Sequence, residues 1–161
     1  MPQTTIATTG TWTEKEIRQQ PASWLRSLNN IDNLRASIDS FLTPLLRKPD
    51  LRIVLTGAGT SAFIGDIIAP WLASHTGKNI TAIPTTDLVT NPMDYFSPSH
   101  PLLLVSFARS GNSPESVAAV ELANQFVPEC YHLSITCNEA GSLYQNAVDR
   151  KSTRLNSSHG P

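Results

Sequence analysis

The stretch Leu51-Arg-Ile-Val-Leu-Thr-Gly57-Ala-Gly59-Thr60-Ser61 is an apolar run that ends in a loop of small residues, and an apolar helical segment follows it. A second stretch, Leu102-Leu-Leu-Val-Ser-Phe107-Ala-Arg109-Ser110-Gly111-Asn-Ser113-Pro114-Glu, repeats this order of strand, loop and helix. Each loop sets backbone N–H groups and small hydroxyls at a helix N-terminus, which attracts anions. The two loops together predict a phosphorylated small-molecule ligand.

The chain around these loops alternates strand-like and helix-like segments. Buried strands are predicted at 51–56, 79–84, 101–107 and 130–136, with helices after Ser61, after Ser113 and from Gly141 to Val148. This alternation predicts an α/β fold, a three-layer αβα sandwich around a doubly wound parallel sheet of flavodoxin-like type. If the strand order is 2-1-3-4, the order reverses between the first and third strands, where ligands of such sheets bind. Both loops would then face one crevice.

The amino-acid composition excludes several classes of protein. The formal net charge of the 161 residues is -1 and no block of Lys and Arg occurs, so no nucleic-acid partner is expected. The apolar runs are far shorter than the roughly 20 residues that span a bilayer, and the N-terminus lacks the features of a signal peptide. We therefore expect a cytoplasmic protein without a membrane partner.

Two cysteines and one histidine are the candidates for redox or metal chemistry. Cys130 and Cys137 are seven positions apart, so on one extended strand they point to opposite faces and a disulfide is not expected. His132 shares a face with Cys130, but no third or fourth metal ligand accompanies the pair. We interpret the pair as part of the strand core and expect no metal.

The segments that flank the alternating part form separate regions. Residues 1–10 are polar and are expected to be disordered, and 11–48 are expected to form a helical extension that packs on the domain that follows. A capping box of Thr13 and Glu16 opens the extension, Pro21 ends its first helix and Pro44 kinks its last. The stripe expected to be buried comprises Ile31, Leu34, Ile38, Phe41, Leu42, Leu45 and Leu46.

Two of the predicted helices carry apolar side chains that should face the sheet. In the helix after Ser61 these are Phe63, Ile64, Ile67, Ile68 and Trp71, and in the helix after Ser113 they are Val117, Val120 and Phe126.

The last residues, 150–161, break the alternating pattern. They contain one apolar residue, show no periodicity and arrive where a fifth strand is due. The segment resembles translated adapter sequence joined to a truncated gene, so it is excluded from the predicted fold. The domain at 49–149 is accordingly expected to be incomplete, with a truncated sheet.

The loops Gly57-Ala-Gly-Thr-Ser61 and Ser110-Gly-Asn-Ser113 resemble the phosphosugar-binding loops of SIS (sugar isomerase) domains. Further segments, Trp12-Thr-Glu-Lys-Glu, Leu51 to Thr76, Pro84 to Tyr95 and Arg109 to Ala140, are similar to the N-terminal part of tagatose-6-phosphate ketose/aldose isomerases, also called galactosamine-6-phosphate deaminase/isomerases. The resemblance implies conversion of galactosamine 6-phosphate to tagatose 6-phosphate and ammonia, without a cofactor, by a protein that forms homo-oligomers when full length.

The same resemblance implies which residues bind the phosphosugar. They are Gly59, Thr60 and Ser61 of the first loop and Arg109, Ser110, Gly111 and Ser113 of the second. Many SIS loops have a serine where this chain has Ala108, so one hydroxyl contact is lost, which Arg109 or the backbone can replace.

The resemblance also places the acid and base of the reaction in a second SIS domain, beyond this sequence. The catalytic residues are therefore unknown. A proton shift between C1 and C2 needs a carboxylate within about 3 Å of that proton. The carboxylates nearest the loops are Glu115, Glu121 and Glu139, of which Glu139 could line the crevice. The terminal His159-Gly-Pro161 is assigned no chemistry.

Two other functions remain open from the sequence. A sugar-phosphate-binding module without catalytic activity fits the same two loops. A dinucleotide-binding oxidoreductase domain fits Gly57-x-Gly59-x-x-Ala62, which satisfies the pattern G-x-G-x-x-G/A. The second strand, however, ends without an acidic residue for a ribose hydroxyl, since Asp87 comes late.

Overall fold

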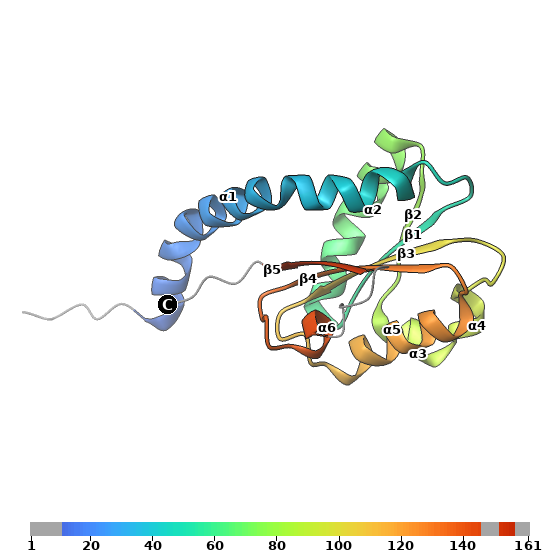
Figure 1. Cartoon of the computed structure of the whole chain (residues 1–161). Helices are drawn as coiled ribbons and strands as arrows, with labels where there is room; N and C mark the ends of the chain where they lie inside the picture. The colour runs from blue at the N-terminus through green and yellow to red at the C-terminus, as the bar shows by residue number, and fades with distance from the viewer. Residues whose placement is uncertain (1–10, 146–151, 157–161) are drawn as a thin grey trace, which may run out of the picture.

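A parallel sheet with helices on both faces forms the body of the computed structural model (Figure 1), which describes residues 11–145 and the backbone of 152–156. The strands are β1 (Arg52–Gly57), β2 (Asn79–Ala82), β3 (Leu102–Ala108), β4 (Cys130–Thr136) and β5 (Ser152–Asn156). The helices are α1 (Trp12–Leu46), η1 (Gly59–Ser61), α2 (Ala62–Thr76), α3 (Thr85–Thr90), α4 (Pro92–Tyr95), α5 (Pro114–Phe126) and α6 (Ser142–Gln145). The prediction for residues 1–10 lies outside the described part.

The strand order is β2-β1-β3-β4-β5, and every neighbouring pair is parallel. The predicted α/β class, the doubly wound sheet and the order of the first four strands are confirmed. The helices α1 and α2 cover one face of the sheet, and α3, α4 and α5 cover the other (Figure 1). The order reverses between β1 and β3, so the loops that follow these two strands meet at one edge of the sheet.

Each face of the sheet has its own apolar core, because successive side chains of a strand point to opposite faces. Ile53 and Leu55 of β1 belong to the core beneath α1 and α2, whereas Val54 belongs to the core beneath α3 and α5. The middle strand β3 is buried along nearly its whole length. The short helices α3 and α4, which the sequence analysis missed, close the second core through Leu88 and Phe96.

The helical extension is one continuous helix, so the prediction that Pro21 ends a first helix is wrong. Pro21 and Pro44 both lie inside α1, and both are exposed. The cap is also two residues earlier than predicted: Thr11 accepts a hydrogen bond from the Glu14 N–H at 3.2 Å. Each proline lacks the N–H that would bond the carbonyl four residues earlier, and the helix continues through both positions.

The expected packing of α1 holds only at its C-terminal end. Leu45 is buried, and Phe41 and Leu42 pack against the core, whereas Ile31 and Leu34 are exposed. The N-terminal half extends beyond the sheet (Figure 1). The apolar stripe therefore correctly predicts a helix, but it does not predict which of its residues pack against the domain.

Most of the α2 residues that were predicted to face the sheet are exposed on the side away from it. The buried residues are Ala62, Gly65 and Ala69, while Ile67 is 76% exposed and Phe63 and Trp71 are each 60% exposed. Gly65 explains this orientation, because a Cβ there would lie 3.2 Å from the Leu55 Cβ and 3.3 Å from the Ala82 Cβ. The backbone approaches the sheet too closely for large side chains.

The same close packing governs α5. Its buried residues are the small Ser116, Ala119 and Ala123, and the predicted Val117, Val120 and Phe126 are only half-buried at its sides. Both helices thus pack against the sheet through small residues and hold their large residues at the flanks or outside.

The segment 152–156, which the sequence analysis left outside the predicted fold, forms β5. It pairs in parallel with β4, from His132 opposite Ser152 to Thr136 opposite Asn156. The exposed backbone groups of an edge strand can pair with almost any extended segment, and a composition without apolar periodicity does not reveal this. No helix within the described residues is long and apolar enough to cross a membrane.

Candidate phosphate-binding site

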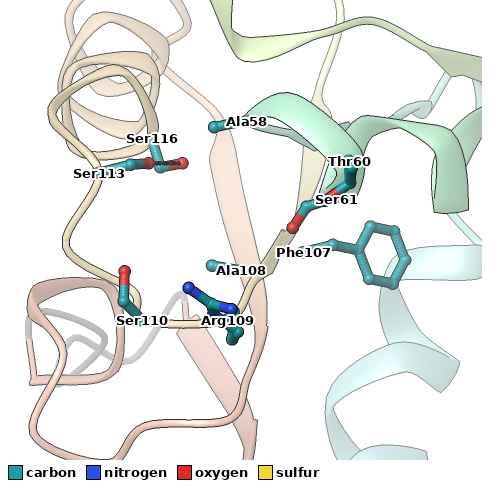
Figure 2. A pocket seen from close by; sticks show the side chains of 9 residues that line it. All are labelled: Ala58, Thr60, Ser61, Phe107, Ala108, Arg109, Ser110, Ser113 and Ser116. Atoms are coloured by element: carbon teal, nitrogen blue, oxygen red, sulfur yellow. Dashed lines mark hydrogen bonds between the residues drawn. The ribbon is translucent and has the colours of Figure 1, made fainter. Parts of the chain in front are cut away.

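The loops after β1 and β3 enclose a pocket of about 260 Å³ at the point where the strand order reverses (Figure 2). One side is formed by Ala58, Thr60 and Ser61, and the other by residues from the end of β3 to the start of α5. The residues on that second side are Phe107, Ala108, Arg109, Ser110, Ser113 and Ser116. The predicted meeting of the two loops is thus what the structure shows.

The first loop owes its shape to two glycines. A Cβ on Gly57 would lie 2.6 Å from the carbonyl carbon of Ser61, so only glycine lets the chain fold back this tightly. Gly59 has a φ of +57°, a left-handed conformation that glycine adopts without strain. The hydroxyl of Thr85 donates a hydrogen bond to the Gly57 carbonyl at 3.2 Å and fixes the end of β1.

The turn of η1 leads directly into α2, with Ser61 at the N-cap position. The Ser61 hydroxyl makes no capping bond to the helix backbone, so it is free of the role that an N-cap serine usually has. It points toward the space between the two loops (Figure 2). A ligand oxygen there would meet both this hydroxyl and the positive end of α2.

The second loop turns at Gly111, whose φ is +68°. Ser113 is the N-cap residue of α5, as predicted, but its hydroxyl donates to the Ser116 hydroxyl at 2.6 Å instead of capping the helix. Ser116 was not among the predicted site residues, although it lines the pocket and is 2% exposed. Its position three residues after the N-cap, facing back to the loop, is the signal that could have identified it.

Of the seven predicted residues, Thr60, Ser61, Arg109, Ser110 and Ser113 line the pocket. Gly59 and Gly111 shape the turns and are not lining residues. Arg109 lines this pocket and is positively charged. Its charge adds to the partial positive charge at the N-termini of α2 and α5. The pocket therefore has the hydroxyl donors and the electrostatic character that an anion requires, and the binding roles of these residues stay predictions.

The candidate acid–base residues lie outside the pocket. Glu115, Glu121 and Glu139 are exposed, and none of them is a lining residue. The described residues that line the pocket therefore include no carboxylate.

The cluster around His132 lies at the opposite end of the strands. Its Nε2 is 2.8 Å from the Asn124 Oδ1 and 3.5 Å from the Cys130 Sγ, and burial lowers the pKa of His132 to about 4. Cys130 is buried, whereas Cys137 is exposed. Residues 11–145 contain no group of three His, Cys, Asp or Glu side chains that could hold a metal ion.

The fold and the pocket define a doubly wound α/β domain with a pocket lined by hydroxyls and Arg109 at its switch point. The chain belongs to the SIS domain family, whose model matches residues 45–156. The match includes the residues of β5, which the sequence analysis had set apart from the domain.

This chain is similar in sequence to two named relatives and in structure to one solved protein. D-galactosamine-6-phosphate deaminase AgaS of Escherichia coli is 80% identical over 143 residues, which cover 89% of this chain and 37% of that protein. The protein of the same name from Shewanella sp. (strain ANA-3) is 51% identical over 142 residues, covering 86% of this chain and 36% of the relative.

The crystal structure of tagatose-6-phosphate ketose/aldose isomerase from Escherichia coli superposes with a TM-score of 0.89 at 76% identity, over 92% of this chain and 41% of that one. This chain therefore spans somewhat more than a third of the length of these relatives.

Proposed function

We propose that this chain is the phosphosugar-binding SIS domain of an amino-sugar-phosphate isomerase/deaminase that converts galactosamine 6-phosphate to tagatose 6-phosphate and ammonia in the cytoplasm. The observation that carries the proposal is the single pocket that Ser61 lines from the first loop and Arg109, Ser110 and Ser113 line from the second. The names of the relatives, deaminase and ketose/aldose isomerase, supply the reaction.

The phosphate is held by hydroxyls, by one guanidinium and by two helix N-termini, and the Ser113 hydroxyl turns from Ser116 to donate to it. Serine and threonine hydroxyls donate to its oxygens, and each such charge-assisted bond contributes about 1.5–3 kcal/mol. Arg109 offers a forked cationic contact, and the N-termini of α2 and α5 add their partial positive charge. Anchoring the phosphate leaves the sugar carbons C1 and C2 to extend out of the pocket.

We assign the proton transfers to residues outside these 161 positions. Moving a proton between C1 and C2 needs a carboxylate within about 3 Å of it, and none of the described carboxylates lines the pocket. The larger part of the relatives' length, which this chain does not span, provides room for those groups.

Calorimetric titration of the chain with galactosamine 6-phosphate tests the binding half of the proposal. We expect binding that Ser61→Ala weakens by about tenfold, while Ser74→Ala, an exposed serine at the far end of α2, leaves it unchanged. An ammonia-release assay tests the other half: the Escherichia coli relative should turn the substrate over and this chain should not. Robust turnover by the chain alone would contradict our placement of the catalytic groups.

A sugar-phosphate-binding module without catalysis is the second candidate, and the absence of a carboxylate from the lining residues favours it. Lack of ammonia release by the Escherichia coli relative would support this module. The dinucleotide-binding alternative has less support. The strand β2 is followed by Ile83, Pro84 and Thr85, none of which is acidic. Titration with NADH, followed by fluorescence, should show no binding.

We also propose that the protein acts as a homo-oligomer on a small-molecule ligand, without a nucleic-acid or membrane partner. Large apolar side chains are exposed along α1 and α2, among them Trp24, Leu28, Ile67 and Trp71. An apolar cavity of about 370 Å³ lies between the end of α1, α2 and the sheet. Apolar surface of this extent on a soluble domain is typical of an interaction site.

A further inference from the structure

The second loop of the pocket is held from behind by the segment that joins β4 to α6. The hydroxyl of Thr136 donates to the Arg109 carbonyl at 3.4 Å, the side-chain amide of Asn138 to the Ser110 carbonyl at 2.9 Å, and the Leu143 N–H to the Gly111 carbonyl at 3.0 Å. Three successive carbonyl oxygens of the loop thus point to donors in 136–143.

The orientation of these carbonyls decides what the pocket can bind. A carbonyl oxygen carries partial negative charge, and one that faced the pocket would repel a phosphate oxygen. Because each oxygen accepts a hydrogen bond from the β4–α6 side, it is kept away from the ligand. We call these three hydrogen bonds the brace of the second loop. By holding the carbonyl oxygens away, the brace favours binding of an anion by the side chains of that loop.

Asn138 is the side chain that makes this brace specific. Its Oδ1 accepts the Ala140 N–H at 3.0 Å, and since a backbone N–H can only donate, the Nδ2 must face the Ser110 carbonyl. Gly141 lies against the same place: a Cβ on it would be 2.4 Å from the Ser110 oxygen. The amide of Asn138 and the bare backbone of Gly141 together fix one position for that carbonyl.

We propose that Asn138 is a positioning residue for phosphate binding, which keeps the Ser110 carbonyl turned away from the pocket. It does not line the pocket and acts through the backbone of the second loop. This inference rests on the proposed function, because it concerns the affinity of the same pocket for an anion.

Asn112 offers a matched control for the test. Its Oδ1 accepts hydrogen bonds from the Ser142 N–H at 2.8 Å and from the Ser142 hydroxyl at 3.0 Å. Asn112→Asp keeps this acceptor, whereas Asn138→Asp replaces the donor that faces Ser110 by an oxygen and keeps only the bond to Ala140. Both variants add one negative charge near the loop, and only Asn138→Asp removes a bond of the brace.

The experiment measures the affinity of both variants for galactosamine 6-phosphate and for inorganic phosphate at low and high salt. At high salt, where the added charge is screened, we expect Asn112→Asp to approach the unaltered chain and Asn138→Asp to remain weaker by about tenfold. Far-ultraviolet circular dichroism checks that both are folded. Equal affinities of the two variants at high salt would overturn the proposal.

Amide hydrogen exchange without ligand separates this inference from the proposed function. Exchange of the Leu143 amide, which donates to Gly111, should be faster in Asn138→Asp than in Asn112→Asp or the unaltered chain. If the unaltered chain bound no phosphate, the proposed function would fail. The exchange data would still test whether Asn138 holds the second loop in place. Unchanged protection of the Leu143 amide in Asn138→Asp would show that it does not.

Discussion

Burial of a single imidazole makes the stability of this domain dependent on pH. His132 is 6% exposed, its Nδ1 has no partner within the described residues, and desolvation lowers its pKa to about 4, compared with 6.5 for an unperturbed histidine. Between these two values the unfolded chain binds a proton that the folded chain does not. Stability therefore falls as the pH drops from about 6.5 to about 4 and loses nothing further from this group below that range.

The first prediction follows from this residue. Lowering the pH from 7 to 5 should remove about 2 kcal/mol from the free energy of unfolding through His132 alone. Urea denaturation at the two pH values measures the loss in the unaltered chain and in His132→Gln, which does not titrate there. If both proteins lost the same amount, protonation of His132 would not be the cause.

At the scale of the element, α1 shows how unevenly one helix contributes to the fold. Leu45 is 4% exposed in the core beneath α1 and α2, whereas Leu25 is 64% exposed on the part that extends beyond the sheet. The ion pair of Lys48 with Glu129 at 2.6 Å joins the residues just after α1 to the start of β4. Only the last turns of the helix are therefore part of the domain core.

The second prediction compares two identical substitutions within this helix. Leu45→Ala should lower the free energy of unfolding by about 2–4 kcal/mol, because it leaves a cavity in the core. Leu25→Ala should change it by less than about 0.5 kcal/mol. Urea denaturation of both variants at low protein concentration gives the answer, and equal losses would mean that the exposed half of α1 also stabilises the monomer.

The sheet could be predicted from the sequence more completely than the helices that cover it. Apolar runs such as Leu102 to Phe107 are buried on both faces, so their composition alone identifies them as strands. The face of α2 could not be predicted in this way, because the contact distance at Gly65 decides which side meets the sheet, and this distance is a property of the packed structure.

The part of the candidate site that was predicted from the sequence is the part formed by the two loops. Glycines at tight turns and serines at helix starts are local signals, so Ser61 and Ser113 could be named before the fold was known. Ser116 could have been named from its position three residues after the N-cap. The brace from Asn138 depends on contacts between segments far apart in the chain. Sequence patterns of short range carry no information on such contacts.

At the scale of the whole molecule, the distribution of apolar surface favours association with a second copy. Phe63, Ile67 and Trp71 recur every fourth residue of α2 and form one exposed stripe, on the same side of the sheet as the exposed part of α1. Burying such side chains from water contributes about 25 cal/mol per Å² of apolar area. In a monomer these side chains stay in contact with water, whereas the proposed homo-oligomer would be stabilised by burying them.

The third prediction tests that association on the chain itself. Sedimentation velocity over a range of protein concentrations should show a dimer or larger species, and Ile67→Glu should shift it to the monomer, because a charge cannot be buried there without a partner. Met93→Glu is the matched control, since Met93 is 79% exposed on α4, on the opposite face of the sheet. A monomer at all concentrations, or equal dissociation by both variants, would show that the α2 stripe is not a self-association surface in this chain.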